Sequence, residues 1–205
     1  MRSFVLLLLL AMLSSALPAQ ETVPVAEPQL MFSLVPQYAF QSGFRLDVDL
    51  PLNKQHWIQL APVFFAGNHV EMGITTADKL SGIALHAYHR FYPDPSPNRR
   101  QPYLAWGPVF QHYAIDYKIH NGNLKVDKHT NINRLGIDLT GGFVTQGSAL
   151  FFDFYAGAGI RQAFLSGDKD SGEKFNDSFL DFGYSGVLLV AGVRVGAVIK
   201  KSEKK

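Results

Sequence analysis

Charged and aromatic side chains recur at every second position in the extended segments of this sequence. The clearest case is 150–161, LFFDFYAGAGIR, in which Asp153, Tyr155 and Arg161 alternate with apolar residues. Because successive side chains of a strand point to opposite faces, one face is apolar and the other polar. Arginine makes planar two-pronged contacts with carboxylates, so the polar faces predict a network of ion pairs. The network expected on this basis comprises Arg45, Asp47, Asp49, His86, Tyr88, Arg90, Arg134, Asp138, Asp153, Tyr155, Arg161 and Arg194.

His86 is the histidine of this polar set that we examined for catalysis. A Ser–His hydrolase needs a serine beside the histidine and an acid that orients the imidazole. Ser81 falls on the opposite face, and no serine lies at strand spacing from His86. The chain contains no cysteine, and its other histidines show no metal-ligand spacing. We therefore expect no enzyme, catalytic residue, metal or cofactor, and we assign His86 to the hydrogen-bond network.

Composition and the two ends of the chain divide the sequence into four parts. Its 205 residues carry 19 basic and 17 acidic side chains, a net charge of +2 that gives no reason to expect a nucleic-acid partner. Residues 1–19 have a basic start, an apolar run and a small-residue end, which predict a cleavable signal peptide. We expect a flexible N-terminal leader at 20–29, a barrel at 30–199 and a basic tail at 200–205.

Alternation of apolar and polar residues predicts eight strands in the region 30–199. An even number of strands can close into an antiparallel up-and-down barrel, which leaves no unpaired sheet edge. We expect a tight turn at 41–43 and long polar loops at 67–79, 119–131 and 162–185. The expected strands are 30–40, 44–52, 56–66, 80–92, 102–117, 132–145, 150–161 and 186–199.

The placement of charge favours a membrane barrel with its polar face inside. All eleven lysines lie outside the expected strands, whereas five arginines and four aspartates share the polar face. Such pairs suit a narrow lumen, and a solvated outer face would more often carry lysine and glutamate. The fold expected is thus an all-β, eight-stranded antiparallel up-and-down transmembrane β-barrel. Aromatic girdles at the membrane surfaces are expected from Tyr38, Phe64, Phe91, Tyr103 and Trp106.

The signal peptide, eight alternating strands and long polar loops together resemble the small outer-membrane class that includes the OmpA transmembrane domain and OmpX. The strand–turn–strand LHAYHRFYPDPSPNRRQPYLAWGPVFQHY is similar to segments of uncharacterised outer-membrane barrel families of Bacteroidetes-type bacteria. The resemblance implies a multi-pass protein of a Gram-negative outer membrane, in contact with its lipid or lipopolysaccharide. An eight-stranded lumen is expected to be filled by side chains. A structural or interaction role is then expected, with loops 67–79, 119–131 and 162–185 contacting another envelope protein.

Two alternatives stay open at the level of the sequence. An outer-membrane lipid-modifying enzyme would need a catalytic constellation at the rim of the barrel. A soluble periplasmic lipocalin-like lipid carrier would place the apolar face inward instead of outward.

Overall fold

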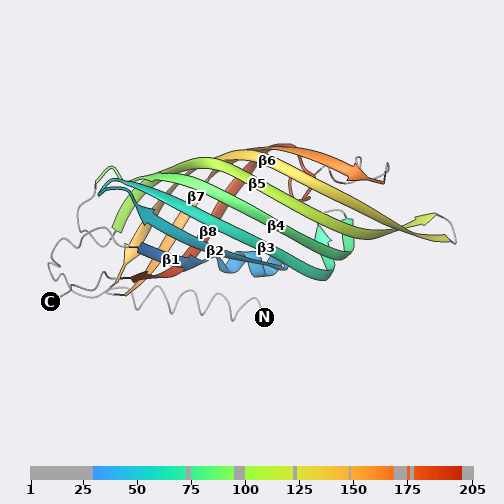
Figure 1. Cartoon of the computed structure of the whole chain (residues 1–205), viewed down its shortest axis with the longest axis horizontal. Coiled ribbons are helices and arrows are strands. Elements are labelled where there is room, and N and C mark those ends of the chain that lie inside the picture. Colours follow the sequence, from blue (N-terminus) through green and yellow to red (C-terminus); the bar gives the residue numbers. More distant parts are fainter. Residues whose placement is uncertain are drawn as a thin grey trace.

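The computed structural model describes residues 30–72, 75–94, 100–121, 124–147, 149–168, 175 and 178–199, which form an all-β closed barrel (Figure 1). Antiparallel strands follow one another around the barrel in chain order, and the last pairs with the first. The predicted eight-stranded up-and-down barrel is therefore confirmed. The expected signal peptide, leader and basic tail lie outside the described residues. The strands are β1 (Leu30–Leu34), β2 (Gly43–Pro51), β3 (His56–Met72), β4 (Thr75–Phe91), β5 (Arg100–Asn121), β6 (Leu124–Gln146), β7 (Leu150–Gly167) and β8 (Gly186–Ile199).

The two ends of the barrel differ in how far the strands extend. Leu30 pairs with Ile199, so the described chain begins and finishes at one end, here called the proximal end. The opposite end is the distal end. The β5–β6 ladder is continuous from the Arg100–Thr145 pair to the Asn121–Leu124 pair, and this hairpin projects distally beyond the other strands (Figure 1).

Two of the three expected long loops are largely paired strand, and the third begins later than predicted, so the predicted bounds were wrong. In place of a loop at 67–79, β3 runs to Met72 and β4 begins at Thr75. In place of a loop at 119–131, β5 and β6 continue to within a few residues of each other, and β7 extends into 162–185 as far as Gly167. Apolar alternation ends where both faces of the sheet meet water. The strands continue beyond that point, because the hydrogen bonds between them are made by backbone groups.

The first hairpin also departs from expectation. We predicted a strand to residue 40 and a tight turn at 41–43, but β1 ends at Leu34 and a 3₁₀ helix, η1 (Pro36–Gln41), follows. Pro36 has no N–H to give to the ladder, and its fixed φ suits the first turn of a helix. Ser42 then adopts a left-handed φ of 54° before β2 starts. No helix in the described part of the chain is long and apolar enough to cross a membrane.

Side-chain exposure separates an apolar exterior from a polar interior. On β6, Leu135, Ile137 and Leu139 are 50–64% exposed, whereas Arg134 and Asp138, at alternate positions, are buried. The same alternation holds around the barrel. The exposed large apolar side chains of the strands include Phe44, Leu50, Phe64, Ile83, Leu85, Leu104, Trp106, Phe110, Phe143, Leu150, Phe154, Ile160 and Leu189.

Two of the aromatic residues expected in outer girdles lie inside the barrel. Tyr103 is 5% exposed and donates its hydroxyl hydrogen to Asp153 at 2.7 Å. Tyr38 belongs to η1 and accepts from Arg45 at 3.3 Å. A phenol fits either setting, because its ring is apolar and its hydroxyl needs a partner when buried. Phe64 and Trp106 do face outward.

Apolar side chains pack the lumen at both ends of the barrel. The proximal cluster includes Met31, Tyr92 and Phe151, and a side chain at Gly196 would place its Cβ 2.6 Å from the Phe151 ring. Glycine there gives the aromatic ring its space. The distal cluster joins β3, β4 and β5 to Phe182, which belongs to the segment after β7. Polar groups occupy the space between the two clusters.

Candidate functional site

The twelve side chains of the predicted polar network all lie on the luminal side of the wall. They come from β2, β4, β6, β7 and β8, and all are buried except Tyr155, which is half-buried. The structure divides them into a compact charged cluster toward the proximal end and a second group around a distal cavity. Even spacing along each strand put them on one face, and closure of the sheet turned that face inward.

The proximal group is an ionic cluster of three arginines and three aspartates, each at most 3% exposed. Arg90 reaches Asp49 at 3.1 Å and Asp153 at 2.8 Å, and thereby joins β4 to β2 and β7. Buried charges persist only when paired and hydrogen-bonded, and here formal charges cancel. The members are Arg45, Arg90, Arg194, Asp47, Asp49 and Asp153, and the further ion pairs are Arg45–Asp47 at 2.6 Å, Arg194–Asp47 at 3.2 Å, Arg194–Asp49 at 3.0 Å and Arg194–Asp153.

Uncharged polar residues that the sequence analysis missed complete the cluster. Gln59 donates to Asp47 at 2.5 Å, and Tyr103 donates to Asp153 at 2.7 Å. The ring of Tyr103 also lies 3.8 Å from the Arg90 guanidinium carbon, within reach of a cation–π contact. Alternation along β3 places Gln59 on the luminal face, so its position could have been predicted. The predicted network included only strands that carry charged residues on that face.

The ionic cluster closes the lumen. Next to it, a void of about 10 Å³ is bounded by Gln59, Tyr88, Tyr103 and Arg194, among others. That volume is about what one water molecule needs. Hydrated ions and solutes are larger, so this part of the barrel is a plug held by side chains.

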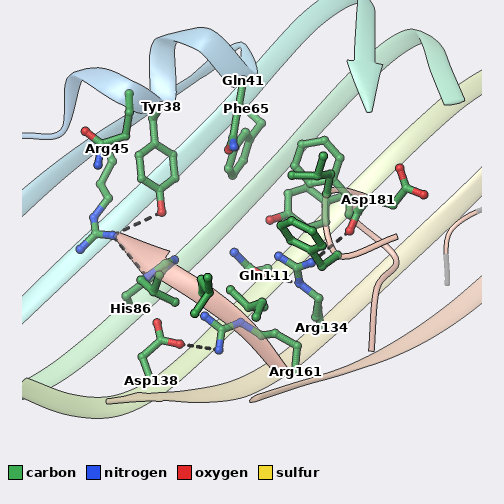
Figure 2. A pocket seen from close by; sticks show the side chains of 18 of the residues that line it. Tyr38, Gln41, Arg45, Phe65, His86, Gln111, Arg134, Asp138, Arg161 and Asp181 are labelled. Atoms are coloured by element: carbon green, nitrogen blue, oxygen red, sulfur yellow. Dashed lines mark hydrogen bonds and ion pairs between the residues drawn. The ribbon is translucent and has the colours of Figure 1, made fainter. Parts of the chain in front are cut away.

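Distal to the plug the lumen opens into a chamber of about 550 Å³ (Figure 2). The expectation of a wholly filled lumen is therefore wrong for this half. We had argued from the number of strands alone, but β1 stops at Leu34 and takes no part in the distal wall. Arg45, His86 and Arg161 reach the chamber from three different strands, and Phe182 and Leu180 enter it from the segment after β7.

A chain of polar contacts crosses the chamber floor. The Nδ1 atom of His86 lies 2.9 Å from the Tyr88 hydroxyl, and Tyr88 donates to Asp138 at 2.6 Å. Arg161 forms an ion pair with Asp138 at 2.6 Å. His86 is only 3% exposed, and its other ring nitrogen, Nε2, is buried without a hydrogen-bond partner. The chamber floor therefore holds unused hydrogen-bonding capacity.

Arg134 differs from the other four luminal arginines. It donates from Nε to the Gln111 side chain at 2.6 Å and from Nη1 to the carbonyl oxygen of Asp181 at 3.4 Å. The other four each form an ion pair with an aspartate, whereas within the described residues Arg134 has no carboxylate at ion-pair distance. Among the described residues it is thus the luminal arginine without an ion pair, and the buried side chain of Asp181 lines the same chamber.

The distal ends of β6 and β7 are joined by exposed charged groups. The backbone N–H of His129 donates to Asp168 at 2.7 Å, and this bond, assisted by Lys128, lowers the pKa of Asp168. The Asp116 carboxylate lies 2.6 Å from Nδ1 of His129 and raises the pKa of that imidazole. Such solvated pairs contribute little to stability, so they orient the hairpin more than they hold the fold.

The geometry of this site offers contacts for a bound ligand. The hydroxyl group in contact with His86 is that of Tyr88, and the described residues contain no group of three or more His, Asp or Glu side chains placed to hold a metal. What the geometry offers is a chamber with a guanidinium, an imidazole nitrogen and apolar walls. Ligand pockets combine these features in similar volumes.

Comparisons with known proteins supply a likeness of fold. No protein-family model matches the chain, and no curated protein matches it. Among solved structures, the barrel is similar to that of CarO from Acinetobacter baumannii, with a TM-score of 0.42 and 16% sequence identity. The alignment covers 88% of this chain and 100% of that chain.

Proposed function

We propose that this protein is a non-enzymatic barrel of a Gram-negative outer membrane, which it enters by way of a cleavable signal peptide. The observation that carries the proposal is the reversed distribution of side chains. Large apolar residues such as Ile137 and Leu139 are 64% and 59% exposed on the outside, while nine charged strand residues are buried inside. This arrangement is favourable in hydrocarbon, and the pairing of β1 with β8 closes the sheet over the proximal part of the barrel.

This distribution argues against the lipocalin-like alternative. A soluble carrier exposes polar side chains and lines its cavity with apolar ones. Here the large apolar residues extend over neighbouring strands, well beyond the isolated patches usual for soluble monomers. The lipid-modifying alternative lacks support of the same kind, because the contacts of His86 are with Tyr88 and Arg45 and include no serine.

The plug and the chamber together favour a binding role over passage through the barrel. The ionic cluster blocks the proximal half, while the chamber and the β5–β6 hairpin are available at the distal end. In the proposed orientation the proximal end faces the periplasm and the distal end faces outward, since short turns are usual on the periplasmic side. The distal segments within 67–79, 119–131 and 162–185 would then meet lipopolysaccharide or another envelope protein.

Planar-bilayer recording tests the plugged barrel. We expect the purified full-length protein, inserted into a lipid bilayer, to give no steady conductance, because the void beside the ionic cluster measures only about 10 Å³. Insertion is checked in parallel by co-sedimentation with vesicles and by a mobility difference between unheated and boiled samples on SDS gels. Stable single-channel steps from inserted protein would contradict a plugged lumen.

A further inference from the structure

The barrel wall has a seam where β1 is too short to cover its neighbour. Pairing of β1 with β8 ends at Leu34 and Val195, although β8 continues distally to Gly186. On the other side of the seam, the last residue of β2 that pairs with β3 is Gly43, opposite Phe65. Distal to these points, β8 and β3 border the seam on either side. The 3₁₀ helix η1 lies at the proximal end of the seam (Figure 1).

A glutamine side chain substitutes for part of the missing strand. In the orientation that satisfies both of its atoms, the Gln37 amide donates to the carbonyl of Val193 at 3.0 Å and accepts from its N–H at 3.3 Å. Backbone groups of alternate residues point to the same side of a strand. The peptide groups of Ala191 and Leu189 therefore point into the seam, beyond the reach of β1.

The seam lies within the apolar band of the exterior. Leu189 and Val187 on β8 are 82% and 64% exposed, and Phe40 of η1 is 87% exposed at its border. If the protein spans a membrane as proposed, these residues meet acyl chains. An unpaired backbone edge at that depth costs several kcal/mol per group, so an opening there calls for a function.

The chamber connects with the seam. Gln37 and Gln41 of η1 and Leu188, Leu189, Val190 and Ala191 of β8 line both. Leu188 and Val190 share the parity of the buried Arg194 on β8 and, with Leu180 and Phe182, make an apolar side to the chamber. Arg134 and His86 contribute polar atoms (Figure 2). One path thus leads from an apolar exterior to a buried cation.

We propose that the seam admits a single-chain amphiphile with a carboxylate head, such as a long-chain fatty acid, from the surrounding lipid into the chamber. The proposal rests on the membrane location argued above. The carboxylate pairs with Arg134, which has no carboxylate at ion-pair distance among the described residues. The acyl chain lies along Leu188 and Val190 and extends through the seam.

Photolabelling with a long-chain fatty acid that carries a diazirine in the part of the acyl chain near the carboxylate tests this inference. The full-length protein in mild detergent is labelled, digested and mapped. We expect label in peptides that contain 179–182 and 187–191. Palmitate should compete about tenfold better than hexadecanol, which has the same chain without the charge. R134Q should remove that preference, and R134K should keep most of it because the positive charge remains.

Each result decides the inference separately from the membrane proposal. Label confined to the outer belt, for example 135–143, or equal competition by palmitate and hexadecanol in the wild type, would overturn it. The wild-type comparison stands even if R134Q does not fold. Only protein with a heat-dependent shift on SDS gels is labelled, so failure of the barrel itself would appear as loss of that shift.

Discussion

Replacement of Asp153 by asparagine should lower the free energy of unfolding by about 3–5 kcal/mol. This carboxylate accepts from Arg90 and from Nε of Arg194, each at 2.8 Å, and from the Tyr103 hydroxyl at 2.7 Å. Asparagine keeps the size but removes the charge and turns a donor toward the guanidinium groups. Arg90 and Arg194 would then lose their shared carboxylate, and the buried cluster would carry one uncompensated positive charge.

Equilibrium urea unfolding in lipid vesicles measures this effect. The matched control is D127N on the distal hairpin, where Asp127 is 86% exposed and lies 3.9 Å from Lys118. We expect the control to change stability by less than about 0.5 kcal/mol. A change below about 1 kcal/mol for D153N would show that the ionic cluster does not hold the barrel together.

Replacement of Leu139 by arginine should destabilise the protein by about 2–4 kcal/mol in a bilayer. Leu139 is 59% exposed and stands near the centre of the outward apolar run of β6. A charge at that depth loses its hydration, whereas the same substitution on a water-exposed surface is nearly neutral.

The same unfolding measurement in vesicles gives the result. Val126→Arg is the control, since Val126 is 41% exposed on the part of β6 that projects distally. The account predicts a small effect there, within about 0.5 kcal/mol. If Leu139→Arg were as harmless as Val126→Arg, the apolar exterior of the barrel would not face lipid.

Strand parity was the part of the fold that could be predicted from the sequence. Alternation placed Arg134 and Asp138 inward and Ile137 and Leu139 outward, and it located β8 at the correct residues. The same signal failed where both faces are polar, so the distal ladder between Asp116 and His129 was mistaken for a loop. It also failed at Pro36, where alternation continued through η1 although the chain had left the sheet.

Membership of the polar network could be predicted, but its partners could not. Arg194 on β8 pairs with Asp47 on β2, far away in sequence, and the contact forms because β1 closes the sheet between these two strands. The chamber was missed for a related reason. It exists because β1 ends early, and the length of one strand cannot be judged from the strands that surround it. Gln37 bonds to the backbone of Val193 at the seam, and no sequence pattern around it predicts this contact.

Cell fractionation of the expressed full-length protein tests the central claim most directly. The account predicts recovery in the outer membrane, release only with detergent, and faster migration of the unheated form than the boiled form on SDS gels. Recovery as a soluble periplasmic protein, with no need for detergent and no mobility difference, would contradict it.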